Sequence, residues 1–145
     1  MLTGFEQQEP AQDDVFQLLQ QMGIREPSFA LHLLKGGWNN RVYRLVVGDF
    51  SFVLKAYFYS ESDSRPRLAH EWAFLRYCHK RGINCVPQSL AILEPVLGLY
   101  SWIEGHAYGG PAAPVLASEI QTALSFIQEL NQNSGNNFEF VPDNL

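Results

Sequence analysis

Two strand-like runs are joined by only two residues, and this spacing constrains the fold more than any other feature of the sequence. The runs "RVYRLVV" (residues 41–47) and "FSFVLKAYF" (residues 50–58) are rich in β-branched and aromatic residues, and Gly48 and Asp49 lie between them. Such residues favour strands, and Gly-Asp between two strands favours a tight turn. A connection this short joins antiparallel neighbours. The sequence therefore predicts an antiparallel hairpin over residues 41–58.

Three further short runs have the same character. Residues 29–34, 88–93 and 97–103 are rich in aliphatic, β-branched and aromatic side chains and are bounded by turn-forming residues. Together with the hairpin they predict a five-stranded antiparallel sheet. A polar segment after the hairpin leads into a helix that we expect to start near Ser64 and Pro66 and to end about Arg81.

Two more helices are predicted from apolar residues at helical spacing. The first follows Asp13 and Asp14 and stops at Gly23, and the second spans residues 114–132. The apolar positions are Val15, Leu18, Leu19 and Met22 in the first helix and Leu116, Ile120, Ala123, Leu124, Ile127 and Leu130 in the second. The expected fold class is α+β.

Composition narrows the range of partners. The chain has 145 residues, of which 46% are hydrophobic, as expected for a packed domain. Its net charge is −5 and its Lys and Arg residues form no run, so nucleic acid is not an expected partner. Long apolar stretches and a leader-like N-terminus are absent from the sequence, so we expect no membrane partner and a cytoplasmic location.

The cysteines and histidines predict no metal site. Cys78 and Cys85 are the only cysteines, and with His70 and His79 they match none of the usual zinc-ligand spacings. We expect both thiols to be reduced.

A lysine stands in the middle of the second strand of the hairpin. Strand alternation places Phe50, Phe52, Leu54 and Ala56 on one face of "FSFVLKAY" and Ser51, Val53, Lys55 and Tyr57 on the other. An ammonium in such a strand either reaches solvent at a sheet edge or is held by a carboxylate and aimed at an anion.

Glu71 is the candidate carboxylate. On a helical wheel it lies in the apolar half of the expected 64–81 helix, between Trp72, Leu75 and Cys78. An inward carboxylate needs a cation, and Lys55 is the nearest one along the preceding strand. The alternative is a local, exposed pair with Arg67 one helical turn earlier.

The order of these segments resembles the N-terminal lobe of the aminoglycoside phosphotransferase and choline kinase family, the small-molecule relatives of protein kinases. The segments that carry the resemblance are "GGWNNRVYRL", "FVLKAY", "RLAHEWAFLRY", "GINCVP", "LYSWIEG" and "ALSFIQELNQ". They resemble, in order, a nucleotide loop, a lysine strand, a glutamate helix, the turn after it, a hinge and a later helix. The joint order and spacing are more specific than any one motif.

The resemblance implies a protein-kinase-like N-lobe in residues 29–105, preceded by an N-terminal helix and lead-in (1–28) and followed by the start of a helical C-lobe (106–145). It implies ATP as the cofactor, with Lys55, oriented by Glu71, on its phosphates. The implied nucleotide-binding residues are Gly36 and Gly37 with Asn39 and Asn40 in the loop, Val42 and Val53 above the adenine, and Trp102, Ile103 and Glu104 at the hinge. For the asparagines, a plain turn role is an equal alternative.

The family's catalytic loop is not found in the sequence. These kinases use the Asp of a His-Gly-Asp motif as the base and later residues to hold Mg²⁺, whereas here no His-Gly-Asp occurs and Asp143 is the only aspartate after Pro111. We therefore expect a fragment whose missing C-lobe supplies the Mg²⁺ ligands and binds a small hydroxylated metabolite. The alternative is a non-catalytic module that binds nucleotide or protein.

Overall fold

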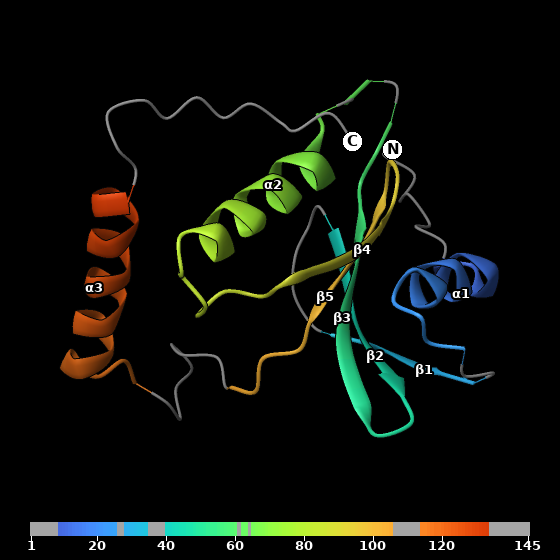
Figure 1. Cartoon of the computed structure of the whole chain (residues 1–145), viewed down its shortest axis with the longest axis horizontal. Coiled ribbons are helices and arrows are strands. Elements are labelled where there is room, and N and C mark those ends of the chain that lie inside the picture. The colour runs from blue at the N-terminus through green and yellow to red at the C-terminus, as the bar shows by residue number, and fades with distance from the viewer. Residues whose placement is uncertain are drawn as a thin grey trace, which may run out of the picture.

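The computed structural model describes residues 9–25, 28–34, 40–60, 62–63, 65–105 and 114–133. It contains a sheet flanked by helices (Figure 1). The elements are α1 (Gln12–Gln21), β1 (Ala30–Leu33), β2 (Asn40–Val47), β3 (Phe50–Tyr57), α2 (Arg67–Lys80), β4 (Ser89–Leu93), β5 (Leu97–Ser101) and α3 (Ala117–Asn133).

All five strands form one antiparallel sheet, in the order β1-β2-β3-β5-β4. The predicted hairpin is confirmed, with Gly48 and Asp49 between β2 and β3. Gly48 has φ of 55°, in the left-handed region that glycine adopts without steric cost. Because β3 lies at the centre of the sheet, a side chain in its middle has neighbouring strands on both sides.

The two faces of the sheet bury different clusters. The strand alternation predicted for β3 is confirmed, since Phe52 and Leu54 belong to one cluster and Val53 and Tyr57 to the other. The first cluster also contains Val15, Leu18 and Leu19 of α1, and the second contains Leu68 and Leu75 of α2. Figure 1 shows the sheet between these two helices.

Helix α1 also shields an edge of the sheet. The side-chain amide of Gln21 donates to the Ile92 carbonyl at 2.8 Å and accepts from the Ile92 N–H at 3.3 Å. Ile92 lies in β4, an outer strand, whose unpaired backbone groups would otherwise face water or another chain. The first helix is therefore part of the same packed unit as the sheet.

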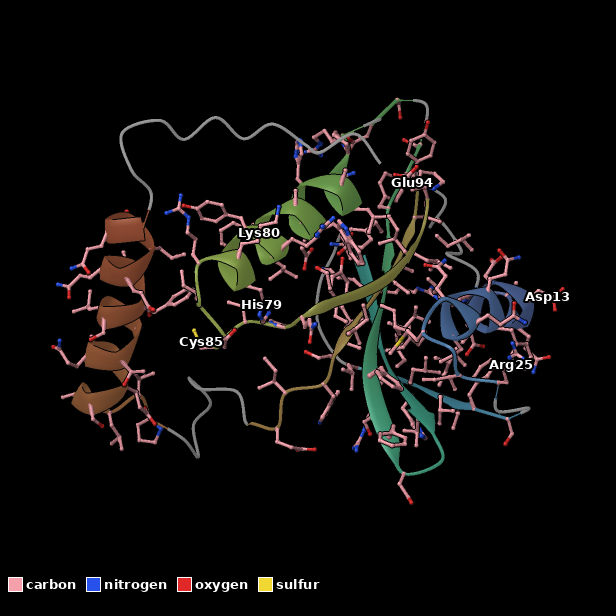
Figure 2. All side chains as sticks on the ribbon, in the orientation of Figure 1. Asp13, Arg25, His79, Lys80, Cys85 and Glu94 are labelled. Carbon is pink, nitrogen blue, oxygen red and sulfur yellow. The ribbon has the colours of Figure 1, made fainter. Side chains whose placement is uncertain are left out.

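The C-terminal end of α2 is tied to the segment that follows it. At its C-terminal end, the His79 ring is 3.1 Å from the Asn84 side-chain oxygen and 3.3 Å from the Pro87 carbonyl, on the path that leads to β4 (Figure 2). Gly82 follows the helix with φ of 78°, in the left-handed region that commonly ends a helix. These contacts tie the end of α2 to the loop that leads into β4.

Helix α3 confirms the last predicted helix. Its large apolar side chains Ile120, Leu124 and Ile127 are each about half exposed. Figure 1 shows α3 apart from the sheet. Within the described ranges, none of the helices has both the length and the apolar character that crossing a bilayer would require.

Replacing Leu18 by alanine should destabilise the fold. Leu18 is fully buried between α1 and the sheet, and Leu→Ala changes at such positions cost about 2–5 kcal/mol. Urea denaturation followed by circular dichroism would measure the loss. Gln17→Ala, at an exposed position of the same helix, is the control. Equal midpoints for the two variants would contradict the packing of α1 on the sheet.

Candidate functional site

An ion pair links the centre of the sheet to α2. The Nζ atom of Lys55 in β3 is 2.6 Å from Oε2 of Glu71 in α2, and the two side chains are 20% and 35% exposed. Lys55 pairs with Val42 of β2 on one side and Gly98 of β5 on the other, so it does not lie at a sheet edge. The expected Lys55–Glu71 contact is confirmed.

Arg67 is not the partner of Glu71. Its guanidinium pairs with Asp63 and donates to the Phe58 carbonyl at 3.0 Å. Arg65 binds both oxygens of Asp63, at 2.7 and 2.6 Å. These hydrogen bonds from Arg65 and then Arg67 hold the pKa of Asp63 well below its usual range. Asp63 thereby ties the start of α2 to the end of β3 and leaves Glu71 available to Lys55.

Two tyrosines that the sequence analysis did not single out complete the site. The Tyr57 hydroxyl donates to Glu71 Oε2 at 2.9 Å, and the hydroxyls of Tyr57 and Tyr100 are 2.6 Å apart. The Lys55 ammonium also lies 5.0 Å from the centre of the Tyr57 ring. Alternation along β3 already placed Tyr57 on the face of Lys55, but no signal in the sequence placed Tyr100 beside it.

Both tyrosines are held in the protonated form. Burial, followed by the hydrogen bond with Tyr100 and the charge of Glu71, raises the pKa of Tyr57 far above its usual value. Burial is also the largest cause that raises the pKa of Tyr100, and the charge of Glu71 adds to it. Their hydroxyls therefore act as hydrogen-bond donors at neutral pH.

Two valines lie on the same face of the sheet as Lys55. Val42 is directly opposite Lys55 in the β2–β3 register, and Val53 is two residues before it on β3. Directly opposite residues, and residues two apart, share a face. The two valines expected to contact an adenine therefore lie on the same face of the sheet as Lys55 and give that face an apolar surface.

The model of the phosphotransferase enzyme family matches residues 30–142 of the chain. The chain belongs to this family. Comparisons with curated proteins and with solved structures each found no match.

The loop residues of this phosphotransferase-family chain are only partly described. Gly36, Gly37 and Asn39 lie outside the described residues. Asn40 begins β2, and its side-chain oxygen accepts a 3.4 Å hydrogen bond from the Phe58 N–H. This contact gives Asn40 a structural task at the end of the β2–β3 pair, which favours the plainer of its two expected roles.

The hinge candidates follow β5 directly. The Arg44 guanidinium lies 4.6 Å from the centre of the Trp102 ring, and Trp102 Nε1 donates to Glu104 Oε1 at 2.7 Å. The Ile103 side chain is 49% exposed. The Trp102 side chain is therefore held against Arg44 of β2. Ile103 and Glu104, the next two residues in the chain, extend from the sheet. Contact of these residues with an adenine edge stays a prediction.

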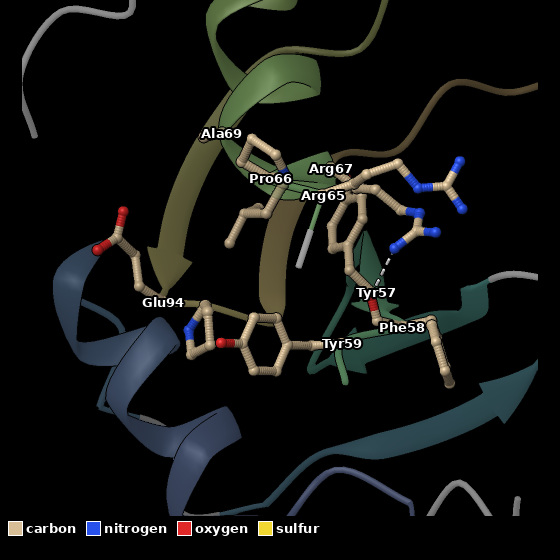
Figure 3. Close-up of a pocket in the computed structure, with 10 residues that line it drawn as sticks. Tyr57, Phe58, Tyr59, Arg65, Pro66, Arg67, Ala69 and Glu94 are labelled. Atoms are coloured by element: carbon tan, nitrogen blue, oxygen red, sulfur yellow. Dashed lines mark hydrogen bonds between the residues drawn. The ribbon is translucent and has the colours of Figure 1, made fainter. Parts of the chain in front are cut away.

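A pocket of about 180 Å³ lies at the other end of α2 from His79 (Figure 3). It is lined by the end of β3, the start of α2 and the β4–β5 turn, including Tyr59, Pro66 and Pro95. Tyr57 is the one member of the Lys55 site among its lining residues. Lys55, Glu71, Val42 and Val53 are not among its lining residues, so the pocket lies beside the Lys55 site and does not contain it.

Stability at alkaline pH should depend on the paired tyrosines. The unfolded chain loses the Tyr57 and Tyr100 protons near pH 10, whereas their raised pKa values retain these protons in the folded state. The contribution of the two tyrosines to the free energy of unfolding is complete below about pH 10. As the pH rises above this value, the free energy of unfolding falls by up to about 1.4 kcal/mol per pH unit for each proton.

Urea denaturation between about pH 9 and 11.5 would measure this loss. The free energy of unfolding of the wild-type chain should fall more steeply than that of a Tyr57→Phe/Tyr100→Phe variant, because the variant has no proton to lose at these positions. Parallel pH profiles for the two proteins would contradict the claim that these hydroxyls are buried and protonated in the folded state.

Proposed function

We propose that this chain is the nucleotide-binding part of an ATP-dependent kinase that phosphorylates a hydroxyl group of a small molecule. The observation that carries the proposal is the Lys55–Glu71 pair at the centre of the sheet. Family membership supports the transfer of a phosphoryl group, and the ion pair supports a nucleotide phosphate as the ligand of the lysine.

The geometry around Lys55 suits an anion that carries an apolar base. Its ammonium has three protons, of which Glu71 accepts one through Oε2, and the side chain is 20% exposed. The remaining protons can donate to phosphate oxygens. Val42 and Val53 offer an apolar surface on the same face for an adenine ring.

ATP with Mg²⁺ fits this site in part. When bound, the metal nucleotide supplies the phosphoryl group and neutralises its charge. The Lys55 ammonium, held by Glu71, fits the phosphates, but the described residues contain no group of three or more His, Cys, Asp or Glu side chains that could hold a metal ion. In this proposal the Mg²⁺ ligands and the base come from a C-terminal lobe, where the acceptor also binds.

Lys55 should account for the preference for a phosphorylated ligand. Isothermal titration of the chain with ATP and with adenosine should give weak binding, with a Kd for ATP of about 1 mM and weaker binding of adenosine. Lys55→Met should lower ATP affinity by about five- to tenfold and leave adenosine binding unchanged, because only the phosphates contact the ammonium.

Lys80→Met is the matched control, since Lys80 is an exposed lysine at the end of α2. Equal ATP affinities for the Lys55 and Lys80 variants, or the absence of saturable ATP binding by the wild type, would contradict the proposal. In an assay of ADP release with amino alcohols as acceptors, the chain should show no turnover. Robust turnover would contradict the assignment of the base and the Mg²⁺ ligands to another lobe.

A further inference from the structure

We propose that Tyr100 and Tyr57 form a hydroxyl relay that positions Glu71, and with it α2, before nucleotide binds. The inference deepens the proposed function, because it takes the phosphate-binding role of Lys55 from it. Tyr57 and Tyr100 are positioning residues here, since neither contacts the reacting atoms in this proposal.

The first observation is that one oxygen of Glu71 accepts hydrogen bonds from both Lys55 and Tyr57. Oε2 of Glu71 accepts from Lys55 Nζ at 2.6 Å and from the Tyr57 hydroxyl at 2.9 Å. While one ammonium proton of Lys55 stays on Glu71, the other two can donate to a phosphate. The Tyr57 hydroxyl gives the half-buried carboxylate a second donor, which matters because a buried carboxylate without partners would be costly.

The second observation is the direction of the hydrogen bonds. A tyrosine hydroxyl has one proton, and that of Tyr57 is donated to Glu71. In the 2.6 Å contact between the two hydroxyls, Tyr100 must therefore be the donor and Tyr57 the acceptor. The chain of donors runs from β5 through β3 to the carboxylate on α2, so that three elements are joined by two hydrogen bonds.

The third observation is the space that Gly98 leaves for Tyr100. These residues are two apart on β5 and share a face, and Gly98 is directly opposite Lys55 in the register. A Cβ atom built on Gly98 would lie 2.6 Å from the Tyr100 hydroxyl oxygen and 2.8 Å from its ring. Since a side chain at position 98 would push the Tyr100 ring away, the relay requires glycine there.

The test measures how strongly pairing with Glu71 protects the Lys55 amine from a chemical reagent in the absence of nucleotide. The chain is treated briefly with acetic anhydride, and mass spectrometry gives the acetylation rate of Lys55 relative to that of Lys80. Tyr57→Phe and Tyr100→Phe should each raise this ratio by about three- to tenfold, the size of effect expected from one net hydrogen bond. Glu71→Gln sets the ratio for a lysine without its carboxylate.

Tyr43→Phe is the matched control. Tyr43 is 3% exposed and belongs to the cluster on the α1 face of the sheet, and among the described residues its hydroxyl has no hydrogen-bond partner. This variant therefore removes a buried hydroxyl outside the relay. The relay predicts a wild-type acetylation ratio for Tyr43→Phe, whereas general loosening of the sheet would raise the ratio in all three tyrosine variants.

Nucleotide titrations separate this inference from the proposed function. Tyr57→Phe, Tyr100→Phe and Gly98→Ala should lower ATP affinity by about threefold and leave adenosine affinity unchanged, which a loss of fold would not do. If Lys55→Met does not affect ATP binding, the proposed function fails, and the acetylation ratios still test the relay. If ATP binding needs Lys55 while the relay variants acetylate as Tyr43→Phe does, the relay is wrong and the proposed function stands.

Discussion

The contact between Lys55 and Glu71 is the interaction on which the rest of the site depends. It joins the central strand to α2 through groups that are 20% and 35% exposed, a degree of burial at which an ion pair alone adds little stability. Its importance is geometric, because it fixes where an ammonium stands on the face that carries Val42 and Val53. The Tyr57 hydroxyl donates to the same oxygen of Glu71, and this hydrogen bond offsets part of the free energy cost of removing the carboxylate from water.

The remainder of the fold supports this contact from two directions. On the far face of the sheet, Leu18 and Leu19 of α1 belong to one core cluster with residues of β2 and β3, and Gln21 pairs with the edge strand β4. On the near face, Asp63 and the arginines beside it fix the start of α2, and His79 fixes its end. These contacts hold the helix that carries Glu71 at both of its ends.

Most of the fold was predictable from the sequence because its signals are local. Gly48-Asp49 specified the central hairpin, and the alternation around Lys55 specified its face. The helical wheel identified Glu71 as inward-facing, which the ion pair confirms. The relay was not predictable, since the approach of Tyr100 to Tyr57 depends on the pairing of β5 with β3 and on the space above Gly98. Strand pairing between segments more than forty residues apart leaves no periodic signal in either one.

The most direct test of the account is a double-mutant cycle on ATP binding with Lys55→Met, Glu71→Gln and the double variant. If Glu71 acts by aiming Lys55 at the phosphates, Glu71→Gln should weaken ATP binding in the wild-type background and have almost no effect once Lys55 is methionine. The predicted coupling free energy is about 1 kcal/mol. Additive effects of the two substitutions, with a coupling near zero, would contradict the claim that the ion pair forms the phosphate-binding unit.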